Sequence, residues 1–279
     1  MRQFLSQSYP DRKGLIFITG KDFRYMRQVL RTKPGDMVSI RLPDGTLQNT
    51  TVAQISEETR TLTLQVCSSK CSLTEKPESS EKHCVSAAQI SANLNATEYW
   101  LFQFIAKPAK MEQIIRQAVE CGVSCIVPIE GAFSQKQNIQ AMNSTKGQRI
   151  ERIIKEARQQ SGSPIDTKVL PPMSLKDACL LWKDAIQTKP DNAAVALWER
   201  TEKSQPIHRI IGQKNVEMAV IAAGCEGGIS SDEIEIMSEY GFVPVHFAVN
   251  ILRCETAALY GIAAVQSAIL ENKSWVYRE

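Results

Sequence analysis

The stretch that decides the fold class is 216–230, VEMAVIAAGCEGGIS. It opens with the run Val216 to Ala223, which is apolar except for Glu217 and is typical of a parallel strand buried on both faces. Glycines crowd the following loop, Gly224–Gly228, and Ser230 with Glu233 then forms the capping-box pattern of a helix start. A strand, a tight loop and a helix therefore follow one another, which is the repeating unit of an α/β fold.

The same alternation extends in both directions from this segment. Apolar runs predict further strands at 99–105, 123–129, 193–197 and 242–247. Apolar residues at helical spacing predict helices at 110–121, through 150–157 with a stop at Gly162, and at 255–270. The last helix is apolar on nearly all sides, so it has to be buried on more than one side, and dimerisation through it is expected. We expect a parallel sheet covered by helices.

The N-terminal quarter of the chain has a different, mostly β pattern. Short runs predict strands at 15–19, 37–42, 51–55 and 61–66, and Asp44-Gly45 predicts a hairpin turn. One helix is expected at Asp22–Arg31, where apolar and Arg residues interleave. The simplest assembly is a small barrel with one basic helix.

Charge is distributed unevenly along the 279 residues. The net charge is only +3, which excludes a histone-like polycation, but residues 1–66 hold 10 Lys and Arg against 6 Asp and Glu. Five of these cations fall within 13 residues: Lys21, Arg24, Arg27, Arg31 and Lys33. Such a stripe suits a phosphate-bearing partner, and the alternative is a solvated helix face.

The Ser-rich segment, the cysteine content and the lengths of the apolar runs further restrict the possible classes of protein. Residues 71–97 are Ser-rich, lack periodicity and are expected to form a linker or an exposed loop. Eight cysteines are too sparse for a disulfide scaffold, and the loose spacing of Cys67, Cys71, His83 and Cys84 favours reduced thiols without a metal. No apolar run reaches the roughly 18 residues that span a bilayer, and no secretory signal is present, so a cytoplasmic protein without membrane contact is expected.

Two loops carry the candidate chemistry, because each follows a predicted strand at the edge of the sheet where α/β proteins bind ligands. The first, Gly224–Gly228, fits neither a dinucleotide fingerprint nor a Walker phosphate loop, and by itself is also compatible with a simple tight turn. The second, Phe247–Ala257, brings Arg253 and Glu255 to the start of the last helix. Cys254 as the nucleophile of a hydrolase is an alternative that no local His or acid signature supports.

Taken together, these segments resemble the RsmE family, which are SPOUT-class methyltransferases acting on a uridine of small-subunit ribosomal RNA. The paired signature is 224–230 followed by 232–234, and then 251–257. Upstream, 110–112 with 120–123 and Pro128, and 29–31 with 34–36, match further family segments. The resemblance thus covers both ends of the chain and most of its middle.

The resemblance implies a fold, a cofactor and an assembly. Residues 1–70 would form a PUA-like β-barrel that binds RNA, 71–97 a Ser-rich linker, and 98–279 a SPOUT-type α/β domain with a trefoil knot. The knot would bind S-adenosylmethionine, and the chain would form a homodimer through its C-terminal domain. The residues implied in cofactor binding are Leu197, Ala222, Gly224, Glu226, Gly227, Gly228, Phe247, Ala248, Ile251 and Leu252.

The implied reaction is methyl transfer to N3 of a specific uridine in 16S ribosomal RNA, with the assembled small subunit as the expected substrate. Because the N3–H group of uracil is not nucleophilic, its proton has to leave and the resulting charge has to be stabilised. Arg253 is the candidate for stabilising that charge, and Glu226 for either accepting the proton or fixing its loop. RNA phosphates would contact Lys21, Arg24, Arg27, Arg31, Lys33, Lys107 and Lys110.

The chain also departs from the family pattern. Cys225 stands where the family usually has Pro, and Asn250 stands where it has an Arg. Tyr25, Gln159 and Ser163 replace the usual His, Glu and Arg of other family segments. Two functions therefore stay open: a methyltransferase with altered substrate handling, and an RNA-binding or ribosome-assembly factor that kept the fold and lost catalysis.

Overall fold

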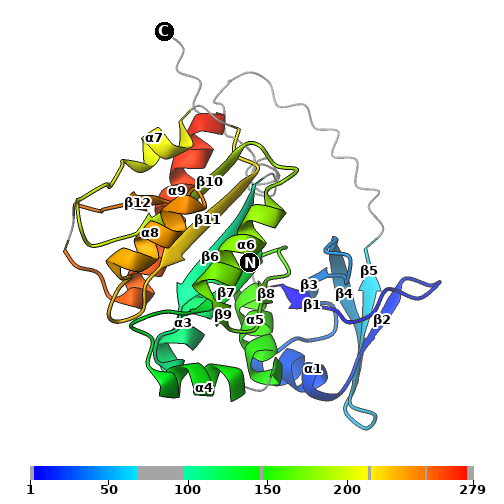
Figure 1. Cartoon of the computed structure of the whole chain (residues 1–279). Helices are drawn as coiled ribbons and strands as arrows, with labels where there is room; N and C mark the ends of the chain where they lie inside the picture. The colour runs from blue at the N-terminus through cyan, green and yellow to red at the C-terminus, as the bar shows by residue number, and fades with distance from the viewer. Residues whose placement is uncertain (1–2, 68–96, 145–146, 213–214, 249, 275–279) are drawn as a thin grey trace, which may run out of the picture. The chain divides into compact units, whose positions relative to one another are not determined.

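The computed structural model describes residues 3–67, 97–144, 147–212, 215–248 and 250–274 (Figure 1). By contacts, the chain divides into two compact units. One comprises the described part of Met1–His83 together with Arg158–Pro164, and the other the described part of Cys84–Ala157 and Ile165–Glu279. The linker expected at 71–97 lies outside the described residues except for Thr97, as do the potential zinc ligands Cys71, His83 and Cys84.

The first unit is built on a five-stranded sheet with the strand order β1-β3-β4-β5-β2. Its strands are β1 (Phe4–Leu5), β2 (Leu15–Ile18), β3 (Met37–Arg41), β4 (Leu47–Ser56) and β5 (Thr61–Val66). The four expected strands are confirmed, and Gly45, with φ +84°, makes the expected turn between β3 and β4. The closed barrel is not confirmed, because in the described residues the two end strands of this path, β1 and β2, do not pair with each other.

The basic helix of this unit begins and ends two residues before the expected 22–31 and is irregular. It begins as α1 (Gly20–Arg24) and continues as one π-helical stretch, η1 (Tyr25–Val29). Phe23 and Met26 are buried in the same apolar cluster as Ile16 and Leu62, so one side of the helix packs on the sheet. The cations between these apolar residues therefore face away from the core.

A short segment distant in sequence completes the first unit. It comprises the last turn of α5 (Gly147–Ser161) and the three residues after it. The side chain of Gln3 donates hydrogen bonds to the carbonyl oxygens of Arg158 (3.0 Å) and Ser163 (3.2 Å). Arg41 donates to the carbonyl oxygen of Gly162 at 3.3 Å and to the Gln3 side chain at 2.8 Å. Residues 158–164, which the sequence places in the second domain, thus belong by contacts to the N-terminal unit.

The second unit contains the expected parallel sheet, with the order β12-β10-β11-β6-β7-β8 and with β9 also paired to β7. Every strand pair in it is parallel. The strands are β6 (Glu98–Phe104), β7 (Cys125–Glu130), β8 (Lys168–Val169), β9 (Met173–Ser174), β10 (Asn192–Leu197), β11 (Met218–Ala223) and β12 (Val243–Val245). The decisive strand, β11, is buried along its whole length at the centre of the sheet.

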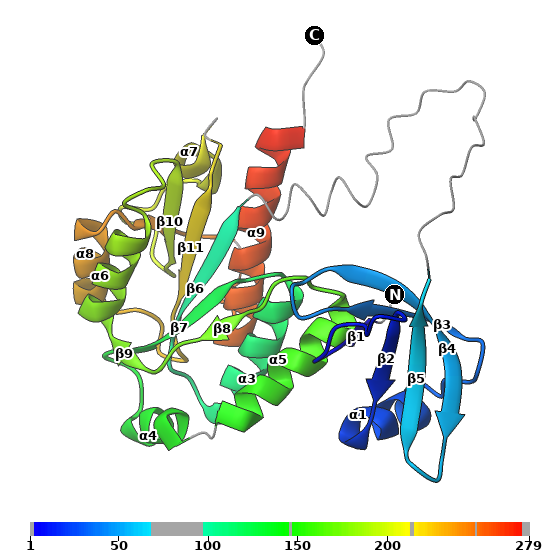
Figure 2. The ribbon, with the colours of Figure 1, turned by 90° about the vertical axis from the view of Figure 1, so that its right-hand side faces the viewer.

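Helices cover both faces of this sheet (Figures 1 and 2). α6 (Leu175–Ala185) and α8 (Ser231–Glu239) lie together on one face, while α3 (Pro108–Glu120), α7 (Ile207–Ile211) and α9 (Cys254–Ser274) lie on the other. α4 (Lys136–Ser144) follows β7. The helices α3, α5, α8 and α9 are confirmed, whereas α4, α6 and α7 were not predicted, although α6 carries apolar residues at helical spacing.

α9 buries one side in the unit and leaves another side exposed. Ala258, Ile262 and Val265 are buried, while Tyr260 is 44% exposed and Ala263 is also exposed. Gly261 lies so close to Leu197 of β10 that an added Cβ would be 2.4 Å from its Cδ1 atom. In the described part of the chain no helix is both long and apolar enough to cross a membrane.

Candidate functional site

A cavity of about 450 Å³ lies at the C-terminal ends of three neighbouring strands, β10, β11 and β12. The loops after these strands form most of its wall, and the first turn of α9 and Lys110 of α3 complete it. Because the strands are parallel, their C-terminal ends meet at one edge, where open α/β sheets bind ligands. The lining residues are Lys110, Leu197, Trp198, Glu199, Gly224–Gly228, Val245–Phe247, Asn250–Cys254 and Ala257.

The loop after β11 folds back tightly on itself. Gly228 donates its N–H to the carbonyl oxygen of Cys225 at 3.0 Å and has a φ of +78°. An added Cβ at Gly224 would lie 2.5 Å from the carbonyl carbon of Gly228, so neither backbone segment has room for a side chain between them. Glycine is therefore required at 224 by a close backbone approach and at 228 by conformation.

The end of this loop is held by the expected capping box of α8. Glu233 accepts hydrogen bonds from the N–H and the hydroxyl of Ser230, both at 2.8 Å, and Ser230 Oγ accepts the N–H of Glu233. The second oxygen of Glu233 accepts the N–H of Ala132 at 2.7 Å. The buried Glu233 side chain thus joins the loop after β7 to the loop after β11.

The other end of the loop is tied to the neighbouring strand β6. Gln103 of β6 donates its side-chain N–H groups to the carbonyl oxygens of Gly224 (3.1 Å) and Phe104 (2.9 Å). This buried side chain fixes where the loop leaves the sheet. Sequence reasoning missed it, because a single Gln in an apolar strand carries no motif.

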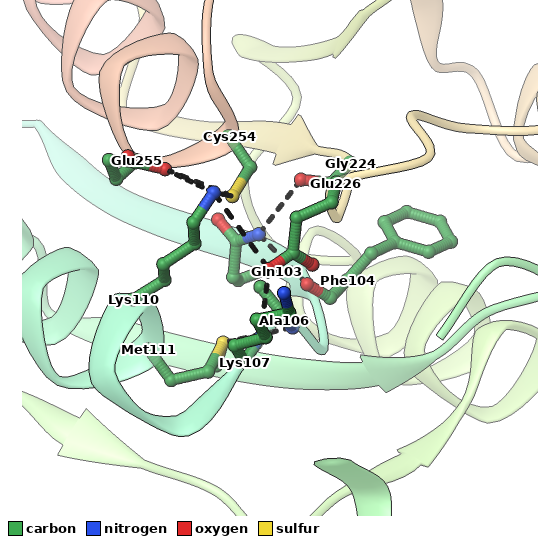
Figure 3. Close-up of polar contacts among 10 residues, drawn as sticks. All are labelled: Gln103, Phe104, Ala106, Lys107, Lys110, Met111, Gly224, Glu226, Cys254 and Glu255. Atoms are coloured by element: carbon green, nitrogen blue, oxygen red, sulfur yellow. Dashed lines mark hydrogen bonds and ion pairs between the residues drawn. The ribbon is translucent and has the colours of Figure 1, made fainter. Parts of the chain in front are cut away.

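Four side chains from three elements form a polar cluster at the cavity, which we call the Lys110 cluster: Lys110, Glu226, Cys254 and Glu255 (Figure 3). The Nζ atom of Lys110 lies 3.1 Å from Glu255 Oε2 and 3.8 Å from Glu226 Oε1, and donates to Cys254 Sγ at 3.7 Å. Glu226 Oε1 also accepts the N–H of Lys107 at 3.2 Å, and Cys254 donates to Glu255 at 3.2 Å. The cluster connects α3, the glycine loop and the start of α9.

The protonation states of the Lys110 cluster follow from these contacts. Burial alone would raise the pKa of Glu255, but hydrogen bonds from its own backbone N–H, Cys254 and Lys110 hold that pKa below its usual value. The hydrogen bond to Glu255 raises the pKa of Lys110. Burial, together with the hydrogen bond to Glu255, raises the pKa of Cys254 to about 12. Cys254 is therefore a thiol at neutral pH, which does not suit the nucleophile of a hydrolase.

Most of the expected cofactor-binding residues line the cavity. The eight that do are Leu197, Gly224, Glu226, Gly227, Gly228, Phe247, Ile251 and Leu252. Ala222 does not, because it is fully buried inside β11, and Ala248 is exposed and lies outside the lining. Sequence reasoning missed Trp198, Glu199, Val245 and His246, although each lies within two residues of an expected one, whereas Asn250 belongs to the stretch Phe247–Leu252 that the family resemblance implies at the pocket.

The expected catalytic pair also lies at the cavity. Arg253 and Glu226 both line it, and Glu226 belongs to the Lys110 cluster. Arg253 is exposed and has no ion pair among the described residues, so its charge is available to a ligand. The structure thereby brings together two residues from loops that follow different strands.

The cations expected to contact RNA fall into two groups. Lys21, Arg24, Arg31 and Lys33 are exposed in the first unit, and Lys107 is exposed in the second. Arg27 instead binds Glu57 at 2.8 Å and the carbonyl oxygen of Thr32, and Lys110 binds the two carboxylates of its cluster. These last two side chains are engaged in ion pairs with carboxylates of their own unit, which sequence spacing alone does not reveal.

A family model described as an RNA methyltransferase domain matches residues 93–266. The chain therefore belongs to this family of RNA methyltransferases. Its relatives include the ribosomal RNA small subunit methyltransferase E of Buchnera aphidicola, 30% identical over 60% of this chain and 62% of that protein. The Borreliella burgdorferi protein named ribosomal RNA small subunit methyltransferase E 2 is 28% identical over 92% of this chain and 93% of its own. The resemblance to the RsmE family is thus confirmed.

Solved structures show the same fold. The ribosomal RNA small subunit methyltransferase E of Neisseria gonorrhoeae, bound to S-adenosyl methionine, superposes with a TM-score of 0.69 over 96% of this chain and 97% of that one, at 20% identity. Such a likeness supports the two-unit α/β architecture described above.

Proposed function

We propose that this protein is an S-adenosylmethionine-dependent methyltransferase that methylates N3 of a specific uridine in 16S ribosomal RNA, with the assembled small subunit as substrate. The observation that carries the proposal is the glycine-lined cavity at the ends of β10, β11 and β12 in a chain of the RNA methyltransferase family. The names of its relatives and the S-adenosyl methionine bound by the Neisseria protein support the reaction class and the cofactor.

The residues at the cavity fit this cofactor. Leu197, Val245 and Leu252 offer apolar walls to an adenosyl group, and the glycine loop offers backbone N–H and C=O groups at close range. Glu199 and Glu226 add carboxylates that complement a positively charged sulfonium and ammonium group. The absence of a Cβ at Gly224 keeps the loop in the conformation that forms this wall.

When bound, the cofactor supplies an electrophilic methyl group. The chain's own residues have to remove the N3 proton and stabilise the anion that results. We assign the first task to the Oε2 atom of Glu226, because Oε1 is held by the Lys107 N–H and by Lys110. We assign the second to Arg253, whose guanidinium is exposed at the cavity without a carboxylate partner among the described residues.

The wider assembly expected from the family is part of the proposal. Lys21, Arg24, Arg31 and Lys33 would bind RNA phosphates on the first unit, and Lys107 on the second, whereas Arg27 and Lys110 would act through their carboxylate partners. The loops that line the cavity would form a trefoil knot, and the exposed side of α9 would pair two copies into a homodimer. A cytoplasmic location follows from a ribosomal substrate.

The test begins with calorimetric titration of the purified protein with S-adenosylmethionine. Methyl incorporation from radiolabelled cofactor is then measured into assembled small subunits and into naked 16S RNA, and the product nucleoside is identified by mass spectrometry. We expect binding, transfer to the subunit and 3-methyluridine. Absence of binding would overturn the methyltransferase, binding without transfer would favour the assembly factor, and another methylated position would overturn N3.

A further inference from the structure

Phe133 is a half-exposed aromatic ring beside the glycine loop that lines the cavity, although it is not itself a lining residue. It lies between β7 and α4 and is 51% exposed. Its ring packs against Gly227, where an added Cβ would lie 2.7 Å from Phe133 Cβ and 3.0 Å from Cγ. Gly227 lines the cavity, so the ring packs against a residue that forms part of the wall and leaves a large part of its own surface in water.

The backbone that carries this ring is held by contacts that do not involve the ring. Ala132 donates its N–H to Glu233 at 2.7 Å, and Gly131 donates its N–H to Ser134 Oγ at 3.3 Å. Gly131 also abuts Phe104 of β6, because an added Cβ there would lie 2.2 Å from the ring of Phe104. The exposure of Phe133 is therefore built into a fixed loop rather than being the result of a loose one.

We propose that Phe133 stacks on the base of the target nucleotide as that base leaves the RNA, and so is a substrate-binding residue of this enzyme. The inference rests on the proposed function. A nucleotide that enters the cavity loses the stacking of its neighbours, and aromatic side chains replace that stacking in proteins that bind unstacked bases. A phenyl ring holds a base by its face and makes no hydrogen bond to it, so the edge of the uracil that carries N3 stays free to face the cavity.

The first test compares Phe133→Ala, Phe133→Leu and Phe133→Tyr with the wild-type protein. We expect kcat/KM for the RNA substrate to fall about 5- to 150-fold in the Ala variant, mainly through KM, because stacking on one aromatic side chain is lost. Leu should not rescue the loss, since it restores apolar area without a π-face, whereas Tyr should. The calorimetric affinity for S-adenosylmethionine should stay unchanged. The matched control is Leu180→Ala, which truncates a 42% exposed apolar residue of α6 outside the cavity lining.

The second test gives a spectroscopic signature of stacking. Phe133→Trp and Leu180→Trp each add one indole at an exposed position, and RNA is titrated into both in the presence of the cofactor while Trp emission is recorded. Quenching beyond that of the wild-type protein is expected only for Phe133→Trp. RNA affinity is measured in parallel by fluorescence anisotropy of labelled RNA.

Three results would overturn the inference: full activity and RNA affinity in Phe133→Leu, equal quenching in the two Trp variants, or a change in oligomeric state in Phe133→Ala without a change in RNA affinity. The last result would mean that the ring belongs to an interface between copies of the chain. Failure of the proposed function has a different signature, namely a wild-type protein without methyl transfer. RNA affinity and quenching still decide the role of Phe133 in that case.

Discussion

Glu226 has two candidate roles, as the proton acceptor of the reaction and as a residue that fixes the glycine loop. Its Oε1 atom is fixed by the N–H of Lys107 and by Lys110, while its backbone is part of the glycine loop that lines the cavity. A glutamine at this position would keep an oxygen for the Lys107 N–H and the shape of the loop, but would lose the negative charge and the basicity. Substitution of Glu226 by glutamine therefore distinguishes the proton-acceptor role from the loop-fixing role.

We predict that Glu226→Gln lowers kcat for methyl transfer about 10²- to 10⁴-fold, the range typical of a lost proton acceptor. The affinity for S-adenosylmethionine should change by less than about tenfold, because the loop is retained. Single-turnover transfer and calorimetry measure the two quantities. A loss of cofactor affinity with unchanged kcat would assign Glu226 to loop fixing alone.

Gly224 tests the shape of the same loop without touching its charge. In Gly224→Ala the new Cβ would meet the backbone of Gly228 at 2.5 Å, and backbone cannot move aside as a flexible side chain can. We expect at least a tenfold loss of cofactor affinity by calorimetry, with the far-ultraviolet circular dichroism of the fold retained. Gly241→Ala is the control, since an added Cβ there meets nothing within 4 Å, although its φ of +83° adds local strain outside the cavity. Equal affinities in both variants would contradict the prediction.

At the scale of elements, the Lys110 cluster fastens α9 to α3 beside the cavity. Glu255 sits in the first turn of α9, where a carboxylate also interacts favourably with the helix dipole. Its lowered pKa means that ionisation of Glu255 stabilises the folded state above the usual carboxyl pKa of about 4.3, and that this contribution is lost as pH falls through the lowered value. The raised pKa of Lys110 means that its contribution is present below about 10.4 and is lost only as pH rises through the raised value.

We therefore predict that Glu255→Gln lowers the free energy of unfolding by about 1 kcal/mol at pH 7, which is roughly 2–4 °C in Tm. The difference from the wild-type protein should shrink as the pH is lowered below about 4. Thermal denaturation followed by circular dichroism across this range is the measurement. A difference that grows toward acid pH would show that Glu255 does not stabilise the fold through its charge.

At the scale of the whole molecule, charge is divided between the two units. Residues 1–66 carry the basic excess, and the exposed cations Lys21 and Arg24 of α1 have no ion pair among the described residues. The second unit carries the cavity, whose charged residues are of both signs. We expect the first unit to supply affinity for RNA phosphate and the second to supply the chemistry.

The salt dependence of RNA binding tests this division. Each phosphate contact contributes about −0.7 to the slope of log K against log salt concentration for single-stranded nucleic acid. The double variant Lys21→Ala/Arg24→Ala should thus reduce the magnitude of the slope by roughly 1 to 2, with S-adenosylmethionine affinity unchanged. Lys176→Ala/Lys183→Ala on the exposed side of α6 is the control of equal charge. The same slope in both double variants would remove the first unit from phosphate binding.

Local patterns were sufficient for most elements of the fold. The apolar run of β11, the capping box of Ser230 and Glu233, and the period-two strands of the first unit all follow from residues adjacent in the chain. The two-residue strands β1, β8 and β9 were not predicted, because two residues are too few to show a periodic pattern. The helix expected at 22–31 became α1 with a π-helical stretch, since local spacing does not report which hydrogen-bond pattern the packing selects.

The sequence by itself determined the α/β class, the glycine loop, the family and the presence of Arg253 and Glu226 after predicted strands. Only the tertiary structure decided that Lys110 meets Cys254, 144 residues away, and that Gln103 and Glu233 anchor the glycine loop from two other elements. The physical reason is the strand order, in which β11 lies between β10 and the distant strand β6 and not beside β12, the strand that follows it in sequence. Pairing of strands that are distant in sequence brings together residues that no local sequence pattern connects. The contact of Phe133 with Gly227 is one example.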